Sequence, residues 1–305
     1  MTIGANNLIE AADYNAIQTV VARVLGSGGS PDATYGYGQT PASAQVAAGN
    51  TVSASHLLNL KADLDSISIH QSNSASSAPS VASGGIIYAS DWSTYSSQAT
   101  SLESSRLTTS SAQMALTDKI NPTFSNWNGT RTHVVTVTFG SANAARYFFN
   151  TGGEIRMYPS QSGFGSGTTK GGRWDALFNS FSPVRFNYTN TSASGGSASS
   201  LGWYDMTSSD QQIFTAVDSG TYSGNDITIY ARCDVGSNSG GTASVLTITI
   251  QFNDDGTYGA TPPGDENVDG TTTSKVSTYR AVASTPPAGA TVTVSDPSVA
   301  TSSGP

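Results

Sequence analysis

Two stretches near the start of the chain carry apolar residues three and four positions apart. The first is residues 8–25 and the second is residues 54–70, where leucines and isoleucines form one stripe. This spacing predicts amphipathic helices, with Asp13 as the N-cap of the first and Ser53 or Ser55 as the N-cap of the second. We therefore expect two helices near the N-terminus, joined by a glycine-rich loop.

A third segment, from Trp92 to Leu116, has sparser apolar residues, and Asp91 is a suitable N-cap. It predicts a helix whose thin apolar face is buried against other copies of the chain more than within one chain. Before it, residues 72–85 are rich in Ser, Ala and Gly and too poor in apolar groups to repay the entropy lost on ordering. We expect them to form a linker between modules or a tether between subunits.

From Phe124 onward apolar and polar residues alternate, which predicts β-strands. The clearest strands are residues 133–139, 226–232 and 244–252, weaker candidates are 201–205, 212–217, 274–282 and 290–294, and residues 172–181 indicate a short helix. Residues 253–256 predict a turn out of the sheet. Short strands separated by turn signals favour an antiparallel sandwich or meander.

Residues 145–158, A-R-Y-F-F-N-T-G-G-E-I-R-M-Y, place two aromatic and β-branched runs on either side of Gly152 and Gly153. Glycine takes the positive φ that a tight hairpin turn requires. The pattern therefore predicts a β-hairpin at the centre of the sheet domain.

The sequence F-F-N-T-G-G-E-I-R within that stretch resembles a signature of virion structural proteins of tailed bacteriophages, notably those of cyanobacterial and marine hosts. Four further motifs resemble the opening segment of the same proteins: D-Y-N-A-I-Q at 13–18, V-L-G-S-G at 24–28, G-Y-G-Q at 36–39 and I-H-Q at 69–71. The resemblance covers most of residues 1–160. The family has a tryptophan where this chain has Leu57 or Leu58, so we expect the second helix to pack differently there.

These patterns together predict a mainly β protein with an N-terminal α-helical module and an antiparallel β-sandwich or meander body. The expected order is an attachment module (1–71), a Ser-rich linker (72–85), a helical connector (86–123), an antiparallel β domain (124–255) and an extended C-terminal arm (256–305). The strand candidates in the arm can pair with the sheet edge or with that of a neighbouring copy.

Composition narrows the classes of function. Charged residues make up only 11% of the chain, the net charge is −8 at pH 7, and the 13 basic residues form no run, so binding to nucleic acid is not expected. No apolar run approaches the roughly 18 residues of a transmembrane helix, and the first residues lack the features of a signal peptide. We expect a protein that is made in the cytoplasm without membrane insertion.

No pattern in the sequence predicts an enzyme or a bound cofactor. Cys233 lies on an alternating strand, where a packed thiol is expected. The acidic residues between 253 and 269 have oxygen ligands that suit Ca²⁺, but the EF-hand spacing is absent, and a solvated acidic loop is the simpler interpretation. Residues 163–172 are glycine-rich, yet Lys170 is followed by glycine and the phosphate-loop pattern is broken.

Seven residues are candidate assembly contacts: Tyr14, Tyr35, Tyr37, Arg146, Glu154, Arg156 and Trp174. Glu154 and Arg156 alternate along the expected hairpin, which suits an ion pair or a contact between subunits. Tryptophans and Tyr204 would stack on sugar rings if they lay exposed at loop tips, although tryptophan in a β domain is more often part of the core.

The resemblance implies a structural component of a tailed-phage virion, of the neck or tail fibre kind. Such a protein forms a homo-oligomer, a trimer or a hexamer, and its N-terminal module attaches it to other virion proteins of the neck or tail. The fibre resemblance favours the trimer, and the virion is the expected location. The alternatives are a receptor-binding module for host-surface glycans, a head decoration protein, and a depolymerase with carboxylates clustered in a groove.

Overall fold

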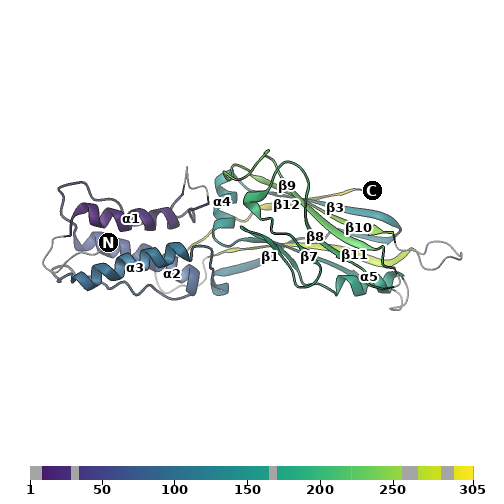
Figure 1. Ribbon diagram of the computed structural model, residues 1–305, viewed down its shortest axis with the longest axis horizontal. Helices are drawn as coiled ribbons and strands as arrows, with labels where there is room; N and C mark the ends of the chain where they lie inside the picture. Colours follow the sequence, from purple (N-terminus) through teal and green to yellow (C-terminus); the bar gives the residue numbers. More distant parts are fainter. Residues whose placement is uncertain are drawn as a thin grey trace. The chain divides into compact units, whose positions relative to one another are not determined.

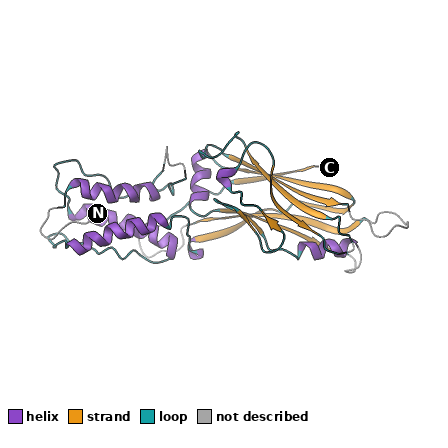
Figure 2. Ribbon diagram, in the orientation of Figure 1, coloured by secondary structure: helices purple, strands orange, loops and turns teal. Residues whose placement is uncertain are grey.

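The computed structural model describes residues 9–28, 34–164, 170–220, 222–255, 267–282 and 292–304. The chain divides into two compact units. The first consists of Met1–Ala115, Arg146–Gly152 and Arg280–Ser295; the second consists of Leu116–Ala145, Gly153–Tyr279 and Asp296–Pro305. Helices dominate the N-terminal part and two antiparallel sheets the remainder, so the predicted fold class is confirmed (Figures 1 and 2).

The N-terminal part of the first unit contains three helices: α1 (Ala11–Leu25), α2 (Ala54–Ser72) and α3 (Ala89–Ser104). Ser53 caps α2 as predicted, because its hydroxyl accepts a hydrogen bond from a backbone N–H of the first turn. Asp13 and Asp91 are not N-caps. Each lies in the first helical turn and accepts a hydrogen bond from the backbone N–H three residues before it, at 3.1 and 3.0 Å, so each helix begins earlier than the predicted cap.

The three helices run in the same direction. Side-chain contacts join their first two turns to one another, and other contacts join their last turns. At the first turns these are Tyr14 Oη to His56 O (3.2 Å) and Tyr95 Oη to Leu57 O (3.4 Å); at the last turns they are Gln71 Nε2 to Leu102 O (2.8 Å) and the ion pair of Arg23 with Glu103. Parallel neighbours need long connections, and residues 26–53 and 73–88 provide them.

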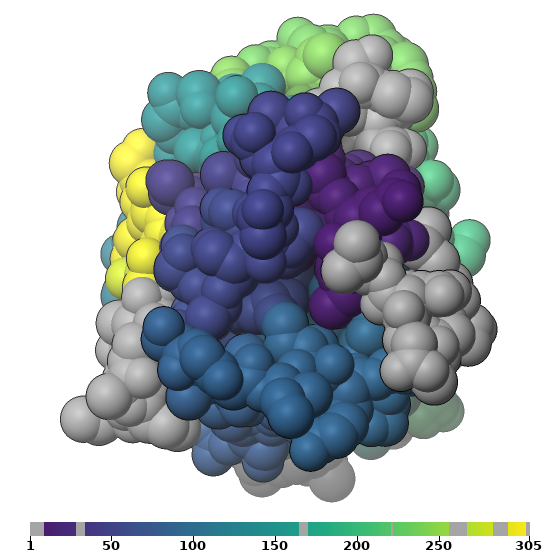
Figure 3. Space-filling view, turned by 90° about the vertical axis from the view of Figure 1, so that its left-hand side faces the viewer, coloured from purple at the N-terminus to yellow at the C-terminus, as the bar shows by residue number. Residues whose placement is uncertain are grey.

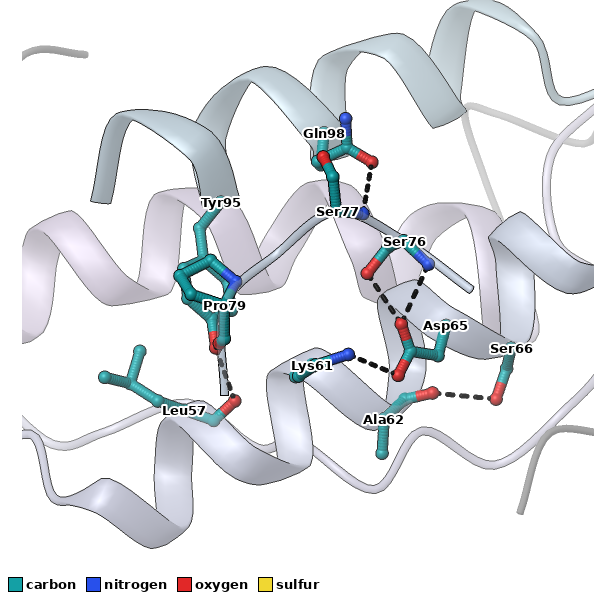
Figure 4. Close-up of polar contacts among 10 residues, drawn as sticks. All are labelled: Leu57, Lys61, Ala62, Asp65, Ser66, Ser76, Ser77, Pro79, Tyr95 and Gln98. Carbon is teal, nitrogen blue, oxygen red and sulfur yellow. Dashed lines mark hydrogen bonds and ion pairs between the residues drawn. The ribbon is translucent and has the colours of Figure 1, made fainter. Parts of the chain in front are cut away.

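Residues 73–88, the return segment, lie along α2 and α3 as an ordered strip (Figure 4). The Asp65 carboxylate accepts hydrogen bonds from the backbone N–H and the hydroxyl of Ser76, at 2.9 and 2.7 Å, and the Tyr95 hydroxyl donates to Pro79 O at 2.7 Å. Residues 72–85, expected to form a linker, do connect α2 to α3, and hydrogen bonds between helix side chains and this segment compensate for its low apolar content.

The second unit contains two antiparallel sheets (Figure 2). In the first sheet the strand order is β1 (Met114–Ile120), β11 (Val268–Ala281), β4 (Glu154–Ser162), β5 (Val184–Phe186) and β6 (Thr191–Ser192), with β2 (Thr123–Trp127) also paired to β11. In the second it is β12 (Ser298–Gly304), β3 (Gly129–Thr138), β10 (Val245–Asp254), β9 (Asp226–Cys233), β8 (Gln211–Val217) and β7 (Ser197–Ala198). The strands predicted near 133–139, 212–217, 226–232, 244–252 and 274–282 are confirmed, and α5 (Lys170–Phe178) confirms the short helix.

The two sheets pack face to face as a sandwich. In β10 every second residue from Leu246 to Asp254 is buried, which is the alternation that the sequence shows. His133 Nδ1 of β3 lies 2.8 Å from the Ser274 hydroxyl of β11, so a polar contact joins the two sheets inside the core. Trp127 and Phe252 pack with their ring centroids 6.3 Å apart in the same interior.

The predicted hairpin over residues 145–158 was wrong. Its first half is α4 (Ala142–Asn150), and only its second half is a strand, β4. Ala145, Phe148 and Phe149 recur at helical spacing and are all buried. Gly152 does take a positive φ of 77°, but it ends a helix instead of turning a hairpin.

Other element boundaries also differ from prediction. The third helix ends at Ser104 and not near Leu116, and its four buried side chains, Trp92, Tyr95, Ala99 and Leu102, pack within one chain, not against another copy. Residues 201–205 hold a 3₁₀ turn, η2 (Trp203–Asp205), in place of a strand, and η1 (Ser111–Gln113) precedes β1.

The C-terminal residues 256–305 are not an extended arm throughout. They supply β11 to the interior of one sheet and β12 to the edge of the other, both paired within the chain. β10 continues to Asp254, so the first two residues of the turn expected at 253–256 belong to the strand instead, and residue 256 lies outside the described residues. Residues 292–294 form no strand, although Val292 and Val294 are buried. The rest of the strand expected at 290–294 lies outside the described residues.

Candidate functional site

Four of the seven predicted contact residues are buried in their own chain. Tyr14 and Trp174 are fully buried, and Tyr37 and Arg146 are nearly so. The Tyr37 hydroxyl donates to Arg106 O at 2.5 Å, and Trp174 Nε1 donates to Asp254 Oδ1 at 3.4 Å. Because their polar atoms are satisfied inside the fold, these side chains serve the packing of one chain and offer no surface to a neighbour.

Tyr35 is half-buried and lies within a group of arginines in the first unit. The guanidinium carbons of Arg23 and Arg106 lie 4.9 and 4.2 Å from its ring centroid, and Arg146 donates to its carbonyl oxygen at 3.4 Å. Cation–π contacts of this kind hold a loop onto helices. Tyr35 therefore anchors the connection between α1 and α2.

Glu154 and Arg156 form the ion pair that their alternation predicts. Arg156 Nε lies 2.6 Å from Glu154 Oε2, and its guanidinium carbon lies 3.8 Å from the ring centroid of Tyr279 on β11. Both side chains are largely covered. The pair links β4 to β11 within one chain.

All four tryptophans are buried, with at most 1% of their surface exposed. Trp127 and Trp174 contact each other with ring centroids 4.8 Å apart, and Trp203 packs against Phe139 at 5.7 Å. The tryptophans therefore form core, as the simpler interpretation of the sequence holds, and provide no sugar-stacking platform. Burial also raises the pKa of the Cys233 thiol, which fits a packed residue.

The described residues at the start of the acidic stretch 253–269 make contacts within the fold. Asp254 is buried and forms an ion pair with Lys170 of α5 at 2.7 Å, so Lys170 binds a carboxylate in the core and not a phosphate. Asn253 donates to the Asp226 carboxylate at 3.1 Å. Among the described residues no three His, Cys, Asp or Glu side chains come together as metal ligands. Residues 256–266 lie outside the described part of the chain.

A hollow of about 580 Å³, open to solvent, lies in the first sheet beside the ends of β2 and β4 and the start of β11. It is lined by Ser125 and Asn126 of β2, Gly163 and Phe164 after β4, and Asp269, Gly270 and Thr271 of β11. The β2–β11 register shifts between Val268 and Thr271, so Asn126 stands opposite two residues. This is a β-bulge, a feature that often redirects side chains next to binding sites.

Exposed apolar side chains gather at the end of the first unit where the three helices begin. Ile86 and Tyr88, just before α3, are 75% and 62% exposed, and Leu58 in the first turns of α2 is 45% exposed. We call these three residues the apolar end. In Figure 3 this end faces the viewer, and the residues around 80–95, in blue, form its lower part.

Sequence reasoning missed both features. The run Gly84-Gly-Ile-Ile-Tyr88 overlaps the predicted linker, and its apolar residues do not by themselves indicate that they are exposed. The hollow joins residues more than 140 positions apart, and only Asp269-Gly270, a common turn pair, marks it locally.

Comparisons of this chain with protein-family models, with curated proteins and with solved structures found no match. No helix within the described ranges combines the length and apolar character needed to span a bilayer.

Proposed function

We propose that this chain is a structural subunit of a tailed-phage virion, of the neck or tail fibre kind, without catalytic activity. In this proposal it forms a homo-oligomer, and its helical unit attaches it to other virion proteins. The resemblance of residues 13–71 and 148–156 to phage structural proteins supports the assignment, and the apolar end supports the mode of attachment.

The apolar end is the structural feature that supports attachment through the helical unit. Ile86 and Tyr88 project from an extended segment and lie at the same end of the unit as the exposed Leu58. A group of exposed apolar side chains marks an interaction site more often than a single one does. The two residues of the extended segment flank the first turns of parallel helices, whose own cores are already filled by Tyr14, Tyr95 and Leu57. The end therefore has a rigid support and apolar area left for another protein.

The area of three side chains is small beside the roughly 800 Å² per partner of a stable interface. A contact of this size becomes strong when several copies bind one particle together, because the second and later contacts are intramolecular. An oligomer of this chain, a trimer or a hexamer, would multiply the apolar end in this way.

The test compares incorporation into phage particles. Phage assembled in cells that supply either the wild-type chain or the variant Ile86→Ser/Tyr88→Ser are purified, and the subunit is quantified by mass spectrometry. We expect the wild type in the particle and at least about a tenfold loss for the variant, since about 1.4 kcal/mol per contact already changes occupancy tenfold.

The matched control is Leu116→Ser/Val217→Ser, which removes two exposed apolar side chains of the second unit, 46% and 57% exposed. It should be incorporated like the wild type. Light scattering of the purified protein should give the mass of a trimer or hexamer. A wild-type chain that is absent from particles and monomeric in solution would refute the proposal.

A further inference from the structure

The hollow in the first sheet is built from backbone of unusual conformation. Asn126, Gly163 and Gly270 all have positive φ, at 49°, 69° and 87°. A Cβ on Gly270 would lie 2.5 Å from Ser162 O, so the bulge approaches the end of β4 more closely than any other residue would allow. Asparagine tolerates the left-handed region better than other non-glycine residues, which suits Asn126 to this turn of the backbone.

Two polar side chains at the rim of the hollow, Asn126 and Asp269, are exposed to solvent. Neither the Asn126 amide nor the Asp269 carboxylate makes a side-chain hydrogen bond to any described residue. The hydroxyls of Ser125 and Thr271 bond each other at 2.8 Å and keep a free lone pair or proton each. Phe164 is the aromatic residue of the lining.

We infer that this hollow binds a neutral sugar unit. A sugar ring offers alternating hydroxyl donors and acceptors that an adjacent carboxylate and amide bind together, and its C–H face packs on an aromatic ring. The volume lies within the range of about 300 to 1,000 Å³ typical of small-molecule sites. The open shape leaves room for a longer glycan to extend into solvent.

Other ligand classes fit the lining less well. An anionic ligand would meet the Asp269 carboxylate on a chain of net charge −8, with no lysine or arginine among the lining residues. An apolar ligand would leave the amide and the carboxylate unpaired. A divalent cation prefers several carboxylates, and this hollow has one.

The floor of the hollow is held by the core beneath it. Gly171 packs directly against Phe164 and Asp269, and a Cβ added to it would be 3.3 Å from Phe164 Cβ and from Asp269 O. It follows Lys170, whose buried ion pair with Asp254 fixes the start of α5. The bulge and the Phe164 backbone therefore rest on a rigid support, and a site preorganised in this way spends little free energy on ordering when it binds.

The experiment is saturation-transfer NMR followed by calorimetry on the full-length protein. The probes are glucose, galactose, mannose and N-acetylglucosamine, with sialic acid as the anionic comparison. The variants are Asp269→Asn, which removes the charge at constant size, and Asn126→Gly, which removes the amide and keeps the positive φ. Asp210→Asn, an exposed aspartate paired with Arg232 on the other sheet, is the matched control.

We expect at least one neutral sugar to bind the wild type and the control, and its Kd to rise about tenfold in each hollow variant, as for one lost hydrogen bond. Binding should persist with EDTA, because no metal bridges the contact. No transfer from any neutral probe, equal Kd values in all variants, preference for sialic acid, or loss of binding with EDTA would each overturn the inference. None of these outcomes bears on incorporation into particles, so the two proposals fail separately.

Discussion

At the scale of single residues, the two buried histidines show how this protein treats polar groups in its interior. His70 and His133 are each 1% exposed. His70 Nε2 donates to Thr151 O at 3.1 Å, and burial lowers its pKa to about 4; burial lowers the pKa of His133 to about 4 as well. Both rings are therefore neutral at pH 7 and act as polar core residues.

His70 should make stability depend on pH. The pKa of His70 is about 4 in the native state and 6.5 in the unfolded chain, so between these pH values the unfolded chain binds a proton that the native state does not bind. This contribution is complete above pH 6.5 and is lost as the pH falls from 6.5 toward 4, by up to about 3 kcal/mol. Urea unfolding followed at intervals across this pH range measures it.

The variant His70→Gln keeps an N–H donor and removes the titration, so its stability should fall less with acid than that of the wild type. His56→Gln is the control, because His56 lies half-buried at the start of α2. His133 contributes equally in all three proteins. Equal pH dependence in His70→Gln and the wild type would contradict the assignment.

At the scale of elements, β11 pairs with neighbouring strands and also forms part of the hollow. It pairs with β4 over nine residues, joins β2, and bulges at Asp269 and Gly270 to form the rim of the hollow. The bulge depends on Gly270, since any other side chain at φ 87° would also collide with Ser162 O.

Gly270→Ala should therefore lower the free energy of unfolding by about 2 to 4 kcal/mol, of which about 1 kcal/mol is the cost of positive φ and the rest is the collision. Gly129→Ala is the control, because Gly129 has φ 71° and no atom within 4 Å of an added Cβ. It should lose only about 1 kcal/mol. Denaturant unfolding measures both, and equal losses would show that the collision is relieved by a small shift.

At the scale of the whole molecule, the helical unit is completed by two later segments of the chain. Asn150 Nδ2 donates to Tyr35 O at 3.0 Å, and His70 contacts Thr151. Near the C-terminus, Val282 N donates to Gln113 O at 3.1 Å. The unit is therefore not the autonomous N-terminal module that the linear order of the sequence suggests.

A fragment of residues 1–115 should lack a cooperative thermal transition by circular dichroism, because it loses the partners of Tyr35 and His70. In the full chain Asn150→Ala should cost about 1 to 3 kcal/mol for the hydrogen bonds it removes. Asn15→Ala does not test this point, because the Asn15 side chain bonds the backbone of Val46, which lies within residues 1–115. A fragment that melts cooperatively at the temperature of the full chain would contradict this view.

The sequence by itself determined the elements whose periodicity is local. The leucine stripe of α2 and the alternation of β3, β9 and β10 each place the apolar residues on one buried face. In the strands, a slip in register by one residue would expose that face. The spacing of neighbouring residues therefore specifies the type of structure. Mainly β class and N-terminal helices follow from those patterns.

Only the tertiary structure decided the rest. Residues 146–150 have both aromatic strand character and helical spacing, and the contacts of Asn150 with Tyr35 and Gly36 favour the helix. Residues 73–88 are ordered by Asp65 and Tyr95, which no local pattern links to them. The hollow joins β2 with β11, and such long-range pairing depends on free energies summed over the whole fold, which a reading of neighbouring residues does not contain.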